Sequence, residues 1–254
     1  MLKSLTMVTL AILLLHLTLL STRTFCAELP SYIQLCKKSD PDVSKCMVNS
    51  FDALLPYMIK GIPELNYPPI DPLHCRNLSL TLGQASVQIH ADLANGVLTG
   101  LGKARAEYSR LNFSTATFIT KVVIPEVKLK GLYRFKGKIL LFEIDGGGAG
   151  EFNATDLSVV FTQFGEYYNK NGARYIRFKK THFTTEMGHM SLYLADLFKN
   201  NELLTQSVNQ AINDNIESLK NELEQIIGKN VEDIILSDYI KIYDMFPVDV
   251  LFPD

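Results

Sequence analysis

The chain has 254 residues, with 25 Lys and Arg against 27 Asp and Glu, so its formal charge is −2. Apolar residues make up 47 % and charged residues 20 % of the sequence; this balance excludes a disordered or polyelectrolyte chain. The near-neutral charge counts against a nucleic-acid binder, and four cysteines are too few for a disulfide-built scaffold.

The first segment is predicted to be a secretory signal. Lys3 precedes an apolar stretch that ends near Leu20, and small residues follow it. The stretch is short for the ~20 residues that span a bilayer, which counts against a membrane anchor. We predict cleavage after Cys26, with cleavage after Ala27 as the alternative, so that residues 1–26 are the signal peptide and residues 27–254 form one domain. No later stretch is long and apolar enough to predict stable membrane insertion.

Three cysteines remain in the predicted mature chain. Cys36 and Cys46 flank a short loop, so a disulfide between them would close a small ring; two free thiols are the alternative. Cys75 is left over and is predicted to be a buried thiol rather than a partner of another chain.

Three Asn-x-Ser/Thr triplets begin at Asn77, Asn112 and Asn153. On a secreted chain each is a possible glycosylation site, although such triplets also arise by chance.

The first predicted helix covers Val43–Ile59, where apolar residues recur at intervals of three and four. Gly61 is expected to end it. The proline-rich stretch Tyr67–Pro72 is expected to be an extended linker.

Residues 78–194 alternate between apolar and polar, which predicts antiparallel strands with one dry face and one wet face. The clearest run is Val127–Leu141. Its predicted dry face carries Val127, Leu129, Tyr133, Phe135, Ile139 and Leu141, and its wet face carries Lys128, Lys130, Arg134, Lys136 and Lys138. The basic face is interpreted as solvated; contact with an acidic membrane surface is the alternative, against which the net charge counts.

Asn-Gly pairs predict two hairpins in this region. Asn95-Gly96 predicts a turn into a strand that carries Gly100, Gly102, Ala104 and Ala106 on its dry face. Asn171-Gly172 predicts a turn between strands Phe164–Tyr168 and Arg174–Phe183.

The final third returns to helical spacing. Apolar residues predict one long helix from Glu202 to Ile227, and a second stretch follows from Val231 to Ile242. The end, Phe246–Asp254, is expected to be extended and apolar. A one-sided sheet needs a cover, and the long helix is the obvious one. The predicted fold class is therefore α+β, a curved antiparallel sheet wrapped around a long helix in a single domain. The spacing of apolar residues does not distinguish a ligand pocket from a filled core.

Motifs for catalysis or metal binding are lacking in the sequence. The run Gly146–Gly150 has no following Lys and Ser/Thr, so it is interpreted as a flexible turn and not as a phosphate loop. There is no Gly-x-Ser-x-Gly elbow, and the mature chain's four histidines fall in no metal motif. We therefore predict no enzyme activity, no cofactor and no metal site.

The chain resembles the insect takeout and juvenile hormone-binding protein family over nearly all of the predicted mature sequence. The residues that carry the resemblance are Leu29-Pro30, Cys36, Cys46, Gly61–Leu65, Ile70–Leu73, Ile124-Pro125, Gly131–Tyr133, Gly137–Leu140, Gly148–Phe152, Leu197-Phe198, Asn200, Leu203, Val208-Asn209 and Asn213. Cys75 and the lack of a second Cys pair differ from the hormone carriers, so the resemblance is to the takeout-like members.

This resemblance implies a tubular lipid-binding fold with an internal hydrophobic tunnel and a Cys36–Cys46 disulfide. It also implies a secreted, non-catalytic carrier in haemolymph or another extracellular fluid, working as a monomer with a possible unidentified receptor. The implied ligand is a small terpenoid, juvenile-hormone-like or fatty molecule, and the implied roles are circadian, feeding or behavioural.

We predict ten tunnel-lining residues from the apolar faces: Phe51, Leu54, Leu55, Met58, Tyr133, Phe135, Leu141, Leu204, Val208 and Ile212. Ordinary core packing is the alternative for each. Tyr133 is the one whose hydroxyl could bond a ligand carbonyl or epoxide. The alternative function is an extracellular signalling or interaction protein with a filled core and no ligand.

Overall fold

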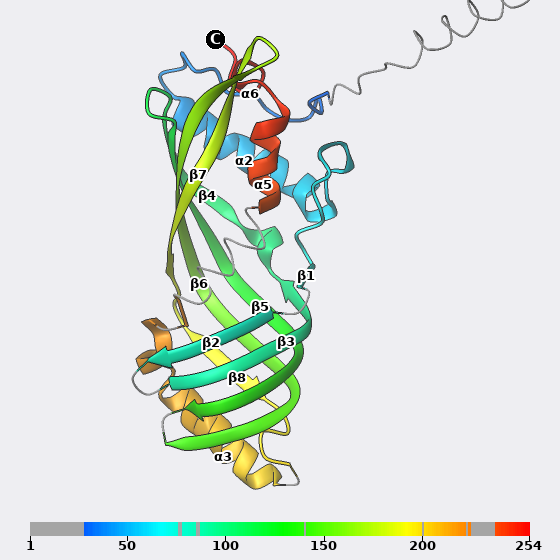
Figure 1. The fold of residues 1–254 in the computed structure, drawn as a ribbon, viewed down its shortest axis with the longest axis vertical. Coiled ribbons are helices and arrows are strands. Elements are labelled where there is room, and N and C mark those ends of the chain that lie inside the picture. The colour runs from blue at the N-terminus through cyan, green and yellow to red at the C-terminus, as the bar shows by residue number, and fades with distance from the viewer. Residues whose placement is uncertain are drawn as a thin grey trace, which may run out of the picture.

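The computed structural model describes residues 28–75, 78–84, 87–139, 141–199, 201–221, 223–224 and 237–254. The predicted signal peptide, the Asn77 triplet's first residue and the first part of the helical stretch predicted from Val231 to Ile242 lie outside the described residues. A long curved sheet runs along the molecule, with α3 at one end and α2, α5 and α6 at the other (Figure 1).

The elements follow one another as a helical segment, a strand region and a second helical segment. In chain order they are α2 (Val43–Lys60), η1 (Pro63–Leu65), β1 (Leu73–Cys75), β2 (Leu78–Gln84), β3 (Val87–Thr99), η2 (Leu101–Lys103), β4 (Arg105–Asn112), β5 (Thr117–Ile139), β6 (Phe142–Lys170), β7 (Ala173–Glu186), β8 (Met190–Leu194), α3 (Glu202–Asp214), η3 (Ile216–Leu219), α5 (Ser237–Met245) and α6 (Val248–Leu251).

The described strands form an 8-stranded antiparallel sheet whose spine is the β5–β6 pair. Toward α3, β3 pairs with one half of β5 and β8 pairs with one half of β6. Toward α2, β4 pairs with the other half of β5, and β7 pairs with the other half of β6. The predicted α+β class with a highly curved antiparallel sheet is confirmed.

The predicted alternation of β5 is confirmed. Val127, Tyr133 and Phe135 are buried, and the basic residues between them face outward. Acidic residues of β6 neutralise that outer face, because Lys130 Nζ lies 2.9 Å from Glu151 and Arg134 lies 2.6 Å from Asp145. This pairing favours the solvated interpretation of the basic face.

Several local predictions are confirmed. The first helix is α2, and Gly61 ends it with a φ of +84°. Asn171 and Gly172 both have positive φ and join β6 to β7 in a tight hairpin. Cys36 and Cys46 form a disulfide, and Cys75 is a free, buried cysteine whose thiol pKa is raised by burial.

The hairpin predicted at Asn95-Gly96 is wrong. β3 continues through these residues, and the pair forms a bulge where the register with β5 shifts between Ala94 and Val97. Asn95 takes a positive φ of 52°, and Gly96 lies opposite Cys75 of β1. A Cβ on Gly96 would lie 3.1 Å from the Cβ of Cys75, so the glycine permits close approach of two strands instead of a turn.

The strand predicted after that turn is also interrupted. Gly100 adopts a φ of +104°, and η2 follows before β4 begins at Arg105. The Asp71 carboxylate fixes this break, because it accepts hydrogen bonds from the backbone N–H groups of Gly100 and Gly102.

The glycine run Gly146–Gly150 is a strand and not the predicted turn. It lies inside β6, and the segment after β8 crosses it at close range. A Cβ on Gly146 would lie 2.3 Å from the carbonyl oxygen of Leu197, and one on Gly148 would lie 2.6 Å from that of Ala195. The glycines therefore allow two backbones to touch.

The predicted helix from Glu202 to Ile227 is interrupted within the described residues. α3 ends at Asp214, and η3 replaces the α-helical geometry at Ile216–Leu219. The extended end predicted for Phe246–Asp254 is wrong in part, because Val248–Leu251 form the short helix α6. No helix among the described residues has the length and hydropathy to cross a membrane.

Candidate functional site

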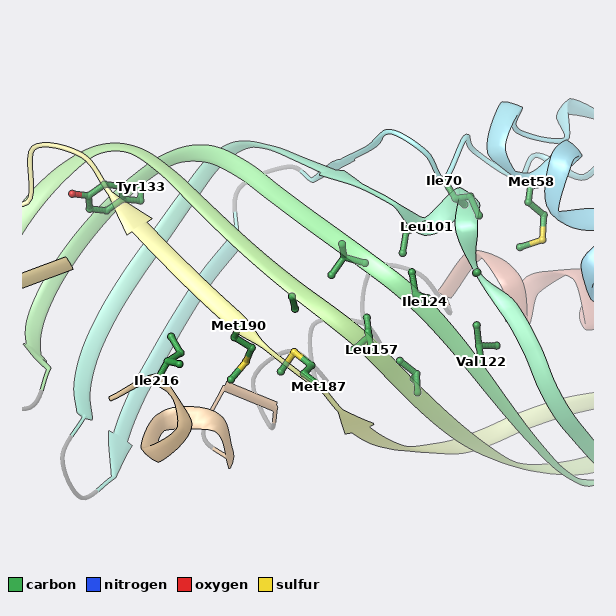
Figure 2. Close-up of a cluster of buried hydrophobic side chains, with 14 of the residues drawn as sticks. Met58, Ile70, Leu101, Val122, Ile124, Tyr133, Leu157, Met187, Met190 and Ile216 are labelled. Carbon is green, nitrogen blue, oxygen red and sulfur yellow. The ribbon is translucent and has the colours of Figure 1, made fainter. Parts of the chain in front are cut away.

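Buried apolar side chains line the concave face of the sheet without interruption from α2 to α3. Figure 2 shows this line from Met58 on α2, past Leu101, Ile124 and Leu157, to Met190 and Ile216. We call these residues and their buried neighbours the main cluster. Its size and continuity make the concave face the candidate functional site.

A cavity of about 120 Å³ opens at the α2 end of this face. Its walls come from the segment before α2, from α2 itself, from the segment around η1 that follows it, and from the region of α5 and α6. The lining residues are Leu29, Ile33, Gln34, Leu35, Cys36, Met47, Ser50, Leu54, Met58, Ile62, Leu65, Tyr67, Ile242, Tyr243, Leu251 and Phe252. Most of these side chains are apolar, and the Ser50 hydroxyl already donates to the Gln34 carbonyl at 2.7 Å. The cavity therefore suits an apolar group. It is smaller than the roughly 300–1,000 Å³ typical of whole-ligand pockets, so it fits part of a long molecule.

Covalent and ionic contacts hold the cavity walls together. The Cys36–Cys46 disulfide, with a Cα–Cα distance of 5.7 Å, ties the first wall to α2. Lys38 reaches the opposite end of the chain, where its Nζ lies 2.6 Å from Asp249 on α6. The hydrogen bond to Asp249 raises the pKa of Lys38, and the same bond lowers the pKa of Asp249. The two chain ends thus form one structure.

A second, smaller cluster packs beside the cavity. Phe118 on β5 contacts the rings of Phe178, Tyr243 and Phe252 at centroid distances of 5.4–6.4 Å in edge-to-face geometry. We call this set, together with Ala116, Ile176 and Val248, the aromatic cluster. It holds α5 and α6 against the sheet.

The four predicted residues of α2 all contact the apolar interior. Leu54 and Met58 line the cavity, and Leu55 and Met58 are buried in the main cluster. Phe51 is partly buried and packs against the same cluster. Their role in binding stays a prediction.

The three predicted sheet residues lie in different environments. Phe135 is buried in the main cluster. The prediction for Leu141 is corrected, because β5 ends at Ile139 and Leu141 lies in the turn with 88 % of its surface exposed. The prediction that the Tyr133 hydroxyl is available to a ligand is also corrected. It donates to the Ala195 carbonyl oxygen at 2.5 Å, and burial raises the pKa of Tyr133 to about 12.

Of the three residues predicted on α3, two are buried in the core and one lies at the surface. Val208 and Ile212 are fully buried in the main cluster. Leu204 is 37 % exposed, because it lies in the first turn of α3, where its N–H bonds the capping Asn201 side chain. Leu204 is therefore corrected to a surface position.

Sequence reasoning missed the cavity walls contributed by the chain ends. Ile33 precedes α2, and Ile242, Leu251 and Phe252 belong to α5 and the end of the chain. The predicted disulfide was the available signal for Ile33, because it places the segment before α2 beside that helix. No local pattern assigns the C-terminal residues to the site.

The two described Asn-x-Ser/Thr triplets lie in different environments. Asn112 is exposed, and its side-chain oxygen accepts from the N–H groups of Ser114 and Thr115 in a turn. Asn153 lies within β6 between β5 and β8, and its Nδ2 donates to Glu151 and Ser191. Among the described residues, no group of His, Cys, Asp and Glu side chains is placed to hold a metal ion.

Comparisons with known proteins agree on the fold. A family model described as haemolymph juvenile hormone binding protein matches residues 12–253. The crystal structure of Epiphyas postvittana Takeout 1 superposes with a TM-score of 0.77 at 20 % identity, covering 87 % of this chain and all of that one. A lipopolysaccharide binding protein gives a TM-score of 0.33 at 10 % identity over 74 % of this chain and 38 % of that one, which carries no weight here. No curated protein sequence matches the chain.

Proposed function

We propose, because the chain belongs to the haemolymph juvenile hormone binding protein family, that it is a secreted carrier of a small hydrophobic ligand. The observation that carries this proposal is the apolar cavity between α2, α5 and the segment before α2, at the end of a continuous apolar concave face. The ligand class is a terpenoid, juvenile-hormone-like or fatty molecule.

Affinity in such a site comes from removing apolar ligand surface from water, at ~25 cal/mol per Å². A few polar groups then set the orientation of the ligand. Phe51, Leu54, Leu55 and Met58 are the side chains of α2 that we propose contact it. Phe135, Val208 and Ile212 form the packed floor toward α3.

The proposal includes the route out of the cell. Residues 1–26 act as a signal peptide, and residues 27–254 are the mature carrier, a monomer in haemolymph or another extracellular fluid. The Cys36–Cys46 disulfide and the family support an oxidising compartment. Asn112 is the described triplet best placed to carry a glycan, because it lies in an exposed turn. A circadian, feeding or behavioural role would follow from the ligand and an unidentified receptor.

The test is the identity of what the secreted protein carries. The protein is purified from the culture medium of insect cells fed with a lipid extract, and an organic extract of it is examined by mass spectrometry. We expect one apolar molecule in stoichiometric amount. The matched control is the Leu54→Arg variant, which places a charge in the cavity wall and should carry far less.

A signalling or interaction protein with a filled core is the other candidate, since Val208 and Leu197 are fully buried at the α3 end. It predicts an empty extract and no uptake of terpenoid or fatty-acid probes by the delipidated protein. That pair of results would overturn the carrier proposal.

A further inference from the structure

Beyond the main cluster, toward the aromatic cluster, the inner face of the sheet also carries buried polar side chains. Ser109 on β4, Thr120 on β5, Gln163 on β6 and Thr181 on β7 belong to adjacent strands. Ser109 is opposite Thr120, and Gln163 is opposite Thr181. We call these four residues the polar belt. Ser109, Gln163 and Thr181 are buried, so the belt lies inside the molecule.

On β4 to β7 the polar belt lies at the boundary between the two apolar clusters, although Phe161 and Phe183, which pack against the main cluster, lie opposite Thr120 and opposite each other. Val122 and Val159 of the main cluster lie on one side of it along β5 and β6. Phe118 of the aromatic cluster is the residue of β5 directly opposite Gln163. The two clusters also meet at the cavity, whose walls include Met58 and Leu65 of the main cluster and Tyr243 and Phe252 of the aromatic cluster. A long molecule that lies along the strands from one cluster to the other passes the belt.

Within the belt, one of the two hydroxyl groups of Ser109 and Thr120 donates to the other at 3.1 Å. Gln163 differs, because it is 1 % exposed and its Nε2 has no hydrogen-bond partner among the residues that the structure describes. Thr185, opposite Val159 of the main cluster, also has a buried hydroxyl with no partner in the described part of the chain. A buried amide left without a partner costs about 1–3 kcal/mol. The sheet thus holds a buried donor that an acceptor on a bound molecule would satisfy.

The chemistry of the belt defines what that molecule brings. The Nε2 atom of Gln carries two N–H donors and no acceptor. Ser and Thr hydroxyls add donors that rotate to suit a partner. The belt residues carry no charge, so a carboxylate placed against them would be buried without a counter-charge. The matching group is a neutral oxygen acceptor such as a ketone, ester or epoxide.

We propose, resting on the carrier function above, that the polar belt is a subsite in which Gln163 donates to the neutral oxygen of an otherwise apolar, elongated ligand. The ligand class narrows to oxygenated lipids or terpenoids with the oxygen partway along the chain. A plain hydrocarbon or an ionised fatty acid fits the belt less well. A buried water molecule on Gln163 is the competing explanation.

The experiment compares matched probes on the delipidated mature protein. A long-chain ketone with a mid-chain carbonyl, the n-alkane of the same carbon count and the corresponding fatty acid each displace N-phenylnaphthylamine, followed by its fluorescence. We expect wild type to bind the ketone about tenfold more tightly than the alkane, which is the worth of one good hydrogen bond.

The Gln163→Leu variant removes the N–H donor of the side chain and keeps a similar side-chain volume. It should lose the preference for the ketone while its affinity for the alkane stays unchanged. Its melting temperature without ligand should equal or exceed that of wild type, because the unpaired amide is gone. Gln163→Met serves the same purpose if the leucine variant does not fold. Gln206→Leu, on the exposed face of α3, is the matched control and should keep the preference.

The outcomes separate the two proposals. If no probe displaces the dye from wild type, the carrier function itself fails. If ketone and alkane bind wild type equally, the carrier stands and the polar belt is not a subsite. A ketone preference that survives in Gln163→Leu and Gln163→Met, or a lowered melting temperature for both without ligand, assigns Gln163 to a buried water and overturns the subsite.

Discussion

The two ends of the sheet are closed by different kinds of interaction. At the α3 end, side-chain amides fasten the helix to the strand: Asn209 Oδ1 accepts from Leu194 N at 2.8 Å, and its Nδ2 donates to Leu194 O at 2.9 Å. Asn213 makes the same pair of bonds with Leu192. At the α2 end, aromatic rings, one disulfide and surface ion pairs surround a cavity.

This difference separates a fixed end from an adjustable one. Hydrogen bonds are directional, so the amides of α3 fix its register along β8 to one position. Apolar contacts are not directional, and side chains around a cavity can shift to suit different occupants. Apart from the Cys36–Cys46 disulfide and the Lys38–Asp249 ion pair, the end that holds the cavity is therefore built from the less directional contacts.

The largest expected effect comes from a substitution that removes hydrogen bonds at the α3 end. Asn209→Ala removes the bonds to both backbone groups of Leu194 and leaves those groups buried without partners. We expect the free energy of unfolding to fall by about 3–5 kcal/mol, measured by urea denaturation. Asn215→Ala is the control, because Asn215 is an exposed residue that bonds only within its own helical segment, and it should cost less than ~1 kcal/mol. Equal losses for the two variants would contradict the fastening role.

A substitution that fills the cavity at the α2 end is expected to have an intermediate effect. Leu54→Phe adds volume to the cavity wall, so uptake of N-phenylnaphthylamine should weaken about tenfold while the free energy of unfolding changes by less than ~1.5 kcal/mol. Dye titration and urea denaturation measure the two quantities. Leu203→Phe on α3, where Leu203 is 77 % exposed, should alter neither. Unchanged uptake in Leu54→Phe would remove the cavity from the binding site.

The smallest expected effect concerns the ion pair between the chain ends. The hydrogen bond from Lys38 lowers the pKa of Asp249, so the pair stabilises the fold above the ordinary pKa of 3.8 and stops doing so as pH falls through the lowered value. Asp249 is largely exposed, so Asp249→Asn should cost no more than ~0.5 kcal/mol at neutral pH. Thermal melts should show that the difference from wild type vanishes in strong acid. A difference that persists there would assign the loss to something other than the ion pair.

Local patterns in the sequence predicted the sheet better than its interruptions. The alternation of β5 is set by neighbours two residues apart, and it appears in the structure as predicted from Val127 to Phe135. The strand ends at Ile139, before Leu141, which is exposed. The two Asn-Gly pairs show where such reasoning stops. Asn171-Gly172 turns the chain, whereas Asn95-Gly96 bulges within β3 because Val97 and Leu98 continue to pair with β5. The deciding partner lies more than thirty residues away, as Val97 opposite Lys130 illustrates.

The candidate site, like the sheet, was predicted only where local patterns determine it. Helical spacing correctly placed Leu54 and Met58 toward the interior, since one face of an amphipathic helix must be buried. Tyr133 was also placed inside, but the partner of its hydroxyl, Ala195, comes from a distant segment that crosses the glycines of β6. The cavity walls from the chain ends depend on contacts between residues about 200 positions apart, such as Lys38 and Asp249, and no periodicity encodes them.

The amides of α3 have a further consequence for β8. A strand with β6 on one side would present free N–H and C=O groups on the other, and such groups recruit strands from neighbouring molecules. Asn209 and Asn213 occupy those groups at Leu194 and Leu192 in the way that another strand would. The helix thereby protects the strand from self-association, which matters for a protein that is proposed to circulate with an apolar interior.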